Sequence, residues 1–287
     1  MNFFKKLNQS IKKNNSLLCI GLDTDISKIP KRFLTRSDLV FEFNKNIIDL
    51  TTDLVCCYKA NIAFYAAQGI PGLKSLQKTI RYIHKHNLPF ILDAKRGDVE
   101  NTAQNYVKEA FDVLEADAVT LNPYLGFDTI EPFLKRKDKG IIVLCRTSNP
   151  GASDFQSTEV SIGNHPGGIN EATPREKTEP LYMLVARKVV EWNKKYKNCL
   201  LVVGATWPTE LELIRKIAPD MFFLVPGIGA QGGDLEQTLK FGLTKEKSGL
   251  TPKNSGLIIS SSRSIIYSNN PKKKAQELQE AINRYRK

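Results

Sequence analysis

The chain has 287 residues, which fits one large α/β barrel or two small domains. Hydrophobic residues make up 41% and charged residues 25%, an ordinary globular balance with enough apolar material for a full core. There is no run of about 18 apolar residues, so we expect no membrane span. The N-terminal segment also lacks the apolar stretch and the cleavage site of a signal peptide.

The formal net charge is +12. The lysines that produce it are scattered over expected helix ends and loops, without interleaved aromatic residues or a recognisable nucleic-acid-binding module. This pattern favours a solvated basic surface over a nucleic-acid-binding face. A positive field would also help to collect an anionic substrate.

The five cysteines form no C-x-x-C pair, and all of them lie in short apolar runs. We therefore expect buried thiols in a reducing, cytoplasmic environment. The three histidines share no ligand spacing with the cysteines, so the sequence indicates no zinc site and no other metal site.

Apolar runs of strand length alternate with amphipathic stretches of helix length along the chain. The expected strands are Leu17–Leu22, Leu54–Lys59, Pro89–Asp93, Ala118–Leu121, Gly140–Cys145, Cys199–Val203, Met221–Val225 and Leu257–Ser260. The expected helices are Asp38–Thr52, Leu73–His86, Thr102–Leu114, Thr129–Lys137, Pro180–Tyr196, Pro208–Ile217, a weaker one around Asp234–Lys240, and Lys272–Arg286. The strands are continuous apolar runs, as expected where both faces of a parallel sheet are buried. The sequence therefore predicts a single-domain (β/α)8 TIM barrel over residues 1–287.

One long segment, residues 148–178, interrupts this alternation after the fifth strand. It contains Gly, Pro, Ser, Asn and Thr with little periodicity. Loops of this length in compact domains are usually functional or disordered. This one begins on the face where barrels place their active sites.

Charged and hydrogen-bonding residues follow most of the expected strands. Because the parallel strands of a barrel all end at one face, these residues should meet there. They are Asp23 after the first strand, Lys59 and Asn61 at the second, Asp93, Lys95 and Asp98 at the third, Thr147 and Ser148 after the fifth, Gln231 and Gly233 after the seventh, and Arg263 after the eighth.

The seventh and eighth units have the composition of a phosphate site. Glycines in Pro226–Asp234 let backbone N–H groups approach an anion closely. Gln231 offers an amide donor, and Arg263 offers a planar guanidinium suited to phosphate oxygens. A glycine-rich turn alone is weak evidence, since glycines also simply turn a chain. Its position after strand seven, paired with an arginine after strand eight, favours phosphate binding.

The third strand end carries a denser group of charges. Asp93 and Lys95 lie two residues apart at an extended strand end, so both side chains can point toward the barrel mouth. Asp98 follows just before the next helix, and Asp23 and Lys59 come from neighbouring strands. A purely structural ion-pair network is the alternative. Such a network would not need a phosphate loop opposite it, so we favour a catalytic cluster.

The string LDAKRGDVENTAQNY, which contains this cluster, closely resembles the signature of the orotidine 5'-phosphate decarboxylase family in its longer bacterial branch, type 2. The D-x-K-x-x-D core is shared with a wider barrel superfamily, but its combination with PGIGAQGGD is specific. Further matching motifs span nearly the whole chain: CIGLD at Cys19–Asp23, YKAN at Tyr58–Asn61, VVGAT at Val202–Thr206, PGIGAQGGD at Pro226–Asp234 and SSRSIIY at Ser261–Tyr267.

The resemblance implies a catalytic tetrad of Lys59, Asp93, Lys95 and Asp98. By similarity, Asp98 enters the active site of the other subunit, which implies a homodimer with shared active sites. Two residues would follow it into the partner's pocket, namely Val99 and Thr102.

The resemblance also implies the contacts to a nucleotide substrate. Asp23 and Lys59 would hold the ribose hydroxyls, with Asn61 close by. The family usually has a serine at the pyrimidine edge, and the pair Thr147-Ser148 leaves open which hydroxyl serves. The phosphate contacts would come from the last two units, through Gln231, Gly233 and Arg263.

The implied reaction converts orotidine 5'-phosphate to uridine 5'-phosphate and CO2 in de novo pyrimidine biosynthesis. Loss of CO2 leaves a carbanion at pyrimidine carbon six that no carbonyl can delocalise as a simple enolate. No metal, Schiff base or other cofactor is indicated, so the protein must supply fixed charge and a proton. Lys95, between Asp93 and Asp98, should stay protonated because opposite charges favour the ammonium form, and it is the expected proton donor.

Two alternatives remain. The first is a Mg²⁺-dependent sugar-phosphate decarboxylase or aldolase of the same barrel superfamily, although Lys59 would put a cation where those relatives bind the metal. The second is a non-catalytic protein that binds nucleotides or RNA, in which the charged cluster would be structural.

Overall fold

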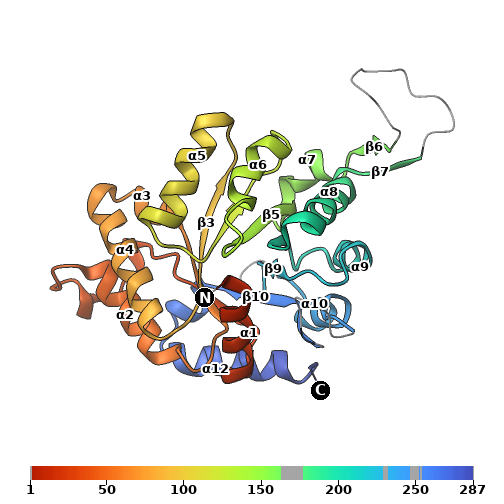
Figure 1. Ribbon diagram of the computed structural model, residues 1–287. Coiled ribbons are helices and arrows are strands. Elements are labelled where there is room, and N and C mark those ends of the chain that lie inside the picture. The colour runs from red at the N-terminus through yellow and green to blue at the C-terminus, as the bar shows by residue number, and fades with distance from the viewer. Residues whose placement is uncertain (1, 163–176, 229–231, 246–251, 253, 287) are drawn as a thin grey trace.

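A computed structural model of the chain describes residues 2–162, 177–228, 232–245, 252 and 254–286. Its centre is a closed barrel of parallel strands surrounded by helices (Figure 1), with neighbouring strands in the order β1-β10-β9-β8-β5-β4-β3-β2. The barrel strands are β1 (Leu18–Gly21), β2 (Cys57–Asn61), β3 (Phe90–Arg96), β4 (Ala118–Leu121), β5 (Gly140–Arg146), β8 (Cys199–Val203), β9 (Phe223–Val225) and β10 (Leu257–Ser261). The predicted (β/α)8 TIM barrel is confirmed.

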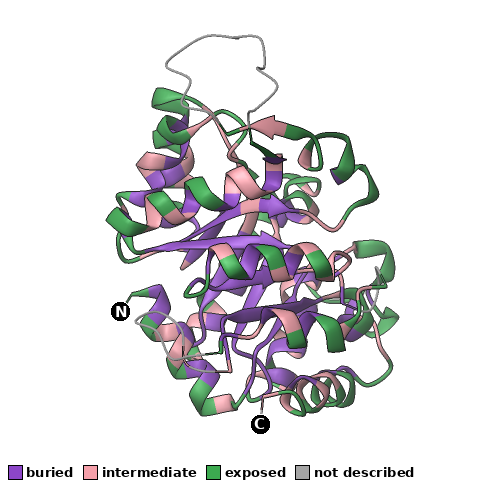
Figure 2. Cartoon of the chain, turned by 90° about the vertical axis from the view of Figure 1, so that its right-hand side faces the viewer, coloured by how far each residue is buried: buried purple, intermediate pink, exposed green. Residues whose placement is uncertain are grey.

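The barrel strands are buried almost throughout, and the exposed residues lie mainly on the encircling helices and the loops (Figure 2). This is why the sequence shows continuous apolar runs instead of alternation at these positions. Each strand candidate overlaps an observed strand, and two have the predicted bounds, Ala118–Leu121 and Cys199–Val203. Strand β2 differs most, since it begins at Cys57 and not at Leu54. Leu54 is the last residue of the turn after the preceding helix, where its N–H donates to the carbonyl of Thr51.

The helices cover the outside of the barrel. The main α-helices are α1 (Phe3–Asn14), α2 (Leu39–Thr51), α4 (Gly69–Lys85), α5 (Glu100–Lys108), α6 (Phe127–Leu134), α8 (Leu181–Tyr196), α9 (Pro208–Ile217), α10 (Leu235–Gly242) and α12 (Pro271–Asn283). Shorter ones are α3 (Ile62–Ala66), α7 (Ser153–Gln156) and α11 (Arg263–Ile266), with 3₁₀ turns η1 (Ile26–Lys28), η2 (Lys31–Phe33) and η4 (Pro150–Ala152). The predicted helix Thr102–Leu114 is α5 followed by a π-helical turn, Glu109–Val113.

Helix α1 was not predicted, although its apolar residues recur at helical spacing. Phe3, Phe4, Leu7 and Ile11 are all buried. The helix is attached to the N-terminal ends of the strands, since the N–H of Phe3 donates to the carbonyl of Asp138 at 2.9 Å and Lys6 pairs with Asp117 at 3.0 Å. It therefore closes the end of the barrel opposite to the catalytic face expected from the sequence.

Short regular elements follow β5 within this interruption. Its first part forms η4 and α7, and a two-stranded antiparallel ribbon follows from β6 (Glu159–Ser161) and β7 (Thr178–Pro180). The long loop expected over residues 148–178 thus contains short regular elements, and α7 contacts the turn after β5 through Gln156, which bonds to Thr147. Residues 163–176 lie outside the described part of the chain.

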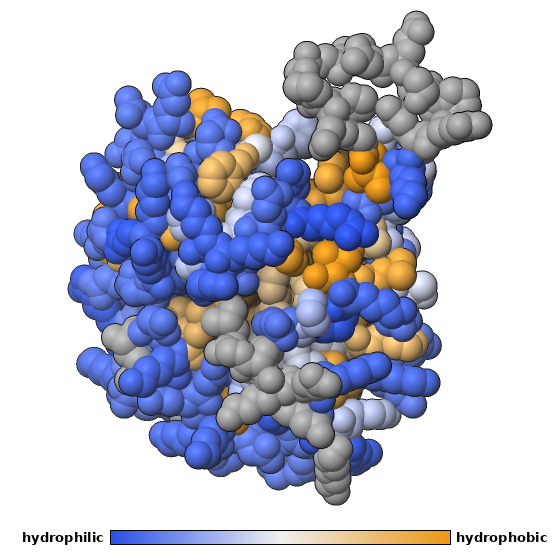
Figure 3. Space-filling view, turned by 45° about the vertical axis from the view of Figure 1, so that its right-hand side comes forward, coloured by the Kyte–Doolittle hydropathy of each residue, from blue (hydrophilic) through white to orange (hydrophobic). Residues whose placement is uncertain are grey.

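All five cysteines are buried and free, as expected. Within the described residues, no helix is long and apolar enough to cross a membrane. The face shown in Figure 3 is mainly hydrophilic, with apolar side chains in several separate groups. This agrees with the expected solvated surface.

Candidate active site

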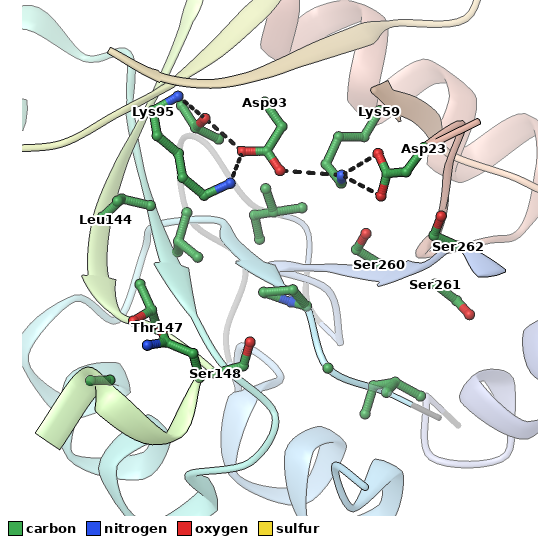
Figure 4. A pocket seen from close by; sticks show the side chains of 18 of the residues that line it. Asp23, Lys59, Asp93, Lys95, Leu144, Thr147, Ser148, Ser260, Ser261 and Ser262 are labelled. Carbon is green, nitrogen blue, oxygen red and sulfur yellow. Dashed lines mark hydrogen bonds and ion pairs between the residues drawn. The ribbon is translucent and has the colours of Figure 1, made fainter. Parts of the chain in front are cut away.

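A cavity of about 510 Å³ lies at the C-terminal ends of the barrel strands, where the sequence placed the polar residues. Asp23 after β1 and the side chains of β2 and β3 form one wall, and the serines at the end of β10 adjoin Asp23. Thr147 and Ser148, after β5, lie across the cavity from this row (Figure 4). The structure brings seven predicted site residues to this cavity: Asp23, Lys59, Asp93, Lys95, Thr147, Ser148 and Arg263.

Lys59 lies between two carboxylates on the first wall. Its Nζ is 3.2 Å from Oδ1 of Asp23 and 3.2 Å from Oδ2 of Asp93. The side chain is only 7% exposed, so the ammonium is shielded from bulk water. This register follows from the parallel ladder, in which Lys59 pairs with Gly21 on one side and with Ile91 on the other.

Asp93 also receives a second ammonium group. Lys95 Nζ lies 2.6 Å from Asp93 Oδ1, and the hydroxyl of Thr120 on β4 donates to the same oxygen at 2.9 Å. The ion pairs thus form a continuous row, Asp23–Lys59–Asp93–Lys95 (Figure 4). Lys95 ends this row and is 45% exposed, so its ammonium is available to a ligand.

The backbone at Lys95 is not in the extended strand conformation that the sequence analysis expected. Lys95 has φ +49°, in the left-handed region, and the pairing of β3 with β4 is irregular between Leu92 and Arg96. The N–H of Lys95 donates to the Thr120 hydroxyl at 3.0 Å, which stabilises this conformation. The side chain is therefore directed by a local distortion and not by regular strand alternation. Such distortions cost free energy and occur preferentially at functional sites.

The electrostatics of the row favour the charged forms. Burial alone would lower the pKa of Lys59, but Asp23 and Asp93 outweigh burial and hold this pKa above its usual range. Burial would raise the pKa of Asp93, but Lys59 and Lys95 outweigh it and lower the pKa to about 2. Asp93 is therefore a carboxylate at every pH at which enzymes normally work.

The two candidate hydroxyls after β5 differ in their partners. Thr147 is engaged, because its hydroxyl donates to Asn149 Oδ1 at 2.7 Å and accepts from Gln156 Nε2 at 2.9 Å. The hydroxyl of Ser148 has no hydrogen-bond partner among the described residues, and Ser148 lines the cavity. Ser148 is consequently the hydroxyl that remains available to a ligand.

The expected phosphate elements lie in the turns after β9 and β10, and β10 is the barrel neighbour of β1. Arg263 is exposed at the start of α11 and lines the cavity, as do Gly227 and Ser262. Gly233 lies in the same turn after β9 as Gly227. Its N–H donates to the carbonyl of Gly227 at 3.1 Å, so that amide is not free for an anion. Gln231 lies outside the described residues.

Four other predicted residues do not line this chain's own cavity. The Asn61 side chain caps α3 by accepting from the N–H of Ala63 at 3.0 Å, while its backbone N–H donates to Asp23 Oδ1 at 2.9 Å. Asp98 Oδ1 accepts from the N–H of Val99 at 2.8 Å and contacts no lysine of its own chain in the described residues. Val99 is 45% exposed, and Thr102 is exposed on α5.

Sequence reasoning missed three residues that shape the site. Thr120 supports Asp93, Gln156 holds Thr147, and Ser262 donates to the Gly21 carbonyl at 2.8 Å. A polar residue inside the apolar run Ala118–Leu121 was a signal for Thr120. Nothing in the sequence connects Gln156 to Thr147, because that contact depends on the fold of η4 and α7.

The described residues contain no group of three or more His, Cys, Asp or Glu side chains placed to hold a metal ion. Between Asp23 and Asp93, the position where a divalent cation would be attracted is taken by the Lys59 ammonium. These donors therefore do not form a Mg²⁺ site.

Comparison with known proteins places this geometry in a family. The model of the orotidine 5'-phosphate decarboxylase / HUMPS family matches residues 16–278. The orotidine 5'-phosphate decarboxylase of Cellvibrio japonicus is 48% identical over 274 residues, covering 94% of this chain and 91% of that protein. The structure of Leishmania donovani OMP decarboxylase superposes with a TM-score of 0.81 at 36% identity, covering 100% of this chain and 99% of that one. Leishmania donovani UMP synthase gives a TM-score of 0.84 at 38% identity, and there the chain spans 57% of the longer protein. With the family model covering nearly the whole barrel, the chain belongs to the orotidine 5'-phosphate decarboxylase / HUMPS family.

Proposed function

We propose that the protein is a carboxy-lyase that converts orotidine 5'-phosphate to uridine 5'-phosphate and CO2, without metal or cofactor. The observation that carries this proposal is the row Asp23–Lys59–Asp93–Lys95 along a cavity that Arg263 also lines. The row offers fixed charge and a proton, and Arg263 offers a phosphate contact. The chemistry that the family name implies requires both.

In the proposed reaction, the C–C bond to the substrate carboxylate breaks and its electron pair stays on pyrimidine carbon six. The Lys95 ammonium stabilises the developing carbanion and then transfers a proton to it. Asp93 holds Lys95 in place through the 2.6 Å contact and lies next to the departing carboxylate. Lys59 keeps Asp93 ionised, so that Asp93 does not compete for the proton.

Magnitudes indicate that these charges do not act alone. One charge pair at about 4 Å and an effective dielectric constant of 20 is worth roughly 4 kcal/mol before desolvation. Enzymes lower barriers by about 8–23 kcal/mol. We infer that the balance comes from binding the phosphate and ribose, which fixes the pyrimidine against the row.

For substrate recognition, we assign the ribose hydroxyls to Asp23 and Lys59, with Asn61 acting through its backbone contact to Asp23. The free hydroxyl favours Ser148 over Thr147 at the pyrimidine edge. Arg263 would bind the phosphate, together with Gln231 and the turn that contains Gly233.

We further propose a homodimer with shared active sites. Asp98 has no lysine partner within its own chain among the described residues, and Val99 exposes an apolar side chain beside it. In such a dimer, Asp98, Val99 and Thr102 of each subunit would lie against Lys95 of the other subunit. Mixing the inactive variants Lys95→Ala and Asp98→Asn tests this, because a mixed dimer has one intact site and should restore up to about a quarter of the wild-type activity. Failure of exchanged subunits to regain activity would contradict shared sites.

In the cell, the reaction would complete uridine nucleotide synthesis in the cytoplasm, with residues 1–287 acting as one catalytic domain. The direct experiment is the fall in ultraviolet absorbance when the purified protein meets orotidine 5'-phosphate, repeated with EDTA. Turnover that is unaffected by EDTA supports the proposal. A protein that is inactive on this nucleotide but active with Mg²⁺ on a sugar phosphate would instead be the barrel relative considered above.

A further inference from the structure

We propose that Thr206 and Trp207, in the turn after β8, are positioning residues that hold the turn after β5 in the conformation that recognises the pyrimidine ring. This inference rests on the proposed function, because it concerns how Ser148 is presented to that ring. Neither residue belongs to the cavity wall itself.

The two turns are joined by hydrogen bonds to three consecutive carbonyls. The N–H of Gly204 donates to the carbonyl of Arg146 at 2.7 Å. The indole N–H of Trp207 donates to the carbonyl of Thr147 at 2.9 Å, and the hydroxyl of Thr206 donates to the carbonyl of Ser148 at 3.3 Å. Because all three carbonyls are held by one neighbouring turn, the backbone that carries Ser148 has a single defined orientation.

The turns also touch without space between them. A Cβ atom on Gly204 would lie 2.7 Å from Cα and 2.8 Å from Cβ of Ser148, which is closer than non-bonded carbons approach. A side chain at position 204 would therefore displace Ser148. Glycine is required here so that the two turns can come into direct contact.

A buried arginine fixes the indole ring. The guanidinium carbon of Arg146 lies 3.9 Å from the centroid of the Trp207 ring, and Arg146 is 1% exposed. Its Nη2 is 3.3 Å from Ser153 Oγ and 3.8 Å from Glu210 Oε1, while Nε and Nη1 have no hydrogen-bond partner among the described residues. A buried charge with so few donors satisfied is costly, and the face of the indole compensates part of that cost. The stack thus holds the ring where its N–H meets the Thr147 carbonyl.

The arrangement predicts an effect specific to the base. The proposed ribose contacts and Arg263 come from β1, β2 and β10, which make none of these contacts. The phosphate-side turn after β9 meets the turn after β8 at Ala205, whose N–H donates to the carbonyl of Pro226 at 2.9 Å, and neither Thr206 nor Trp207 takes part in that bond. Loosening the turn after β5 should therefore weaken a ligand that has a pyrimidine and leave a ligand without one unchanged. A merely structural role would weaken both ligands together.

The test compares inhibition constants for uridine 5'-phosphate and ribose 5-phosphate in Trp207→Phe and Thr206→Val. Each variant removes one donor and keeps most of the volume, so the constant for uridine 5'-phosphate should rise about 3- to 10-fold, while that for ribose 5-phosphate changes less than about 2-fold. Trp192→Phe is the matched control, because Trp192 is the other of the two tryptophans and lies half-buried on α8, against Phe127. It should change neither constant.

The control variant also supplies a direct signal, since Trp207 is its single tryptophan. Uridine 5'-phosphate should change its fluorescence emission, and ribose 5-phosphate should not. An unchanged constant for uridine 5'-phosphate in both variants, or equal losses for both ligands, would overturn the positioning role while wild-type turnover remains. A wild-type protein that neither binds uridine 5'-phosphate nor decarboxylates its precursor would overturn the proposed function itself, and this role with it. Should Trp207→Phe fail to fold, Thr206→Val decides alone.

Discussion

Replacement of Lys59 by methionine should destabilise the protein in a way that depends on pH. The ammonium of Lys59 lies 3.2 Å from both Asp23 and Asp93, and all three side chains are largely buried. Methionine has a similar volume and no charge, so the change leaves two buried carboxylates without the cation between them. Lys95 then remains as the one ammonium in contact with Asp93 among the described residues.

The size of the effect follows from the pKa of Asp93. Lowering that pKa from 3.8 to about 2 contributes about 2 kcal/mol to the free energy of unfolding at neutral pH. This contribution is present above the unfolded pKa of 3.8 and is lost as the pH falls toward 2. Without Lys59, only Lys95 and the Thr120 hydroxyl remain to offset burial. We therefore expect the pKa of Asp93 to rise, which penalises the folded state at neutral pH and less so in acid. Removing one partner of a buried ion pair costs about 3–5 kcal/mol, so we expect that loss near pH 7.5 and a smaller one near pH 5.

Urea denaturation followed by circular dichroism at both pH values measures this loss relative to wild type. Lys45→Met is the control, because Lys45 and Asp49 form an exposed ion pair at 2.8 Å. That pair should contribute less than about 1 kcal/mol at either pH. If Lys59→Met costs less than about 1 kcal/mol, or costs the same at the two pH values, then Lys59 is not what keeps Asp93 ionised.

Other substitutions test separate parts of the molecule. Lys95→Ala should abolish turnover but leave uridine 5'-phosphate binding measurable by calorimetry, and appreciable residual activity would exclude Lys95 as the proton donor. Arg263→Ala should lower kcat/KM strongly for the nucleotide and hardly at all for a substrate that lacks the phosphate; equal losses would argue against a phosphate contact. Arg215→Met should lower the free energy of unfolding by about 3 kcal/mol without changing KM, because the buried guanidinium donates to the carbonyls of Gly242, Ala218, Met221 and Gly256 far from the cavity. A thermal melt that matches wild type would show that these bonds are dispensable.

The barrel could be predicted from the sequence because its strands are buried on both faces and its helices are amphipathic, so both leave clear apolar patterns. Local patterns failed where structure depends on distant contacts. Helix α1 has a clear apolar spacing, but its role in closing the barrel depends on Asp117 and Asp138, more than 100 residues away. The ribbon of β6 and β7 was missed because each strand has three residues, too few to show a period.

The charged row was predictable because each member directly follows or ends an apolar strand run, and parallel strands of a barrel end together. Its detailed geometry was not. The positive φ of Lys95 depends on Thr120 of the next strand, and the difference between Thr147 and Ser148 depends on Gln156. Each of these is a contact between side chains from separate elements, which spacing along one element does not reveal.

Closure of the barrel between β1 and β10 has a consequence for how the protein is made. Leu18 pairs with Ile259, so one edge of β1 stays unpaired until β10, the last strand, has been synthesised. At a synthesis rate of about 5–20 residues per second, that edge stays open on the ribosome for roughly 10–50 seconds. An uncovered parallel edge is a template for unwanted pairing with other chains. Nascent chains of this protein should therefore depend on chaperones until β10 emerges, and the side of the cavity that holds Asp23 cannot meet Arg263 before then.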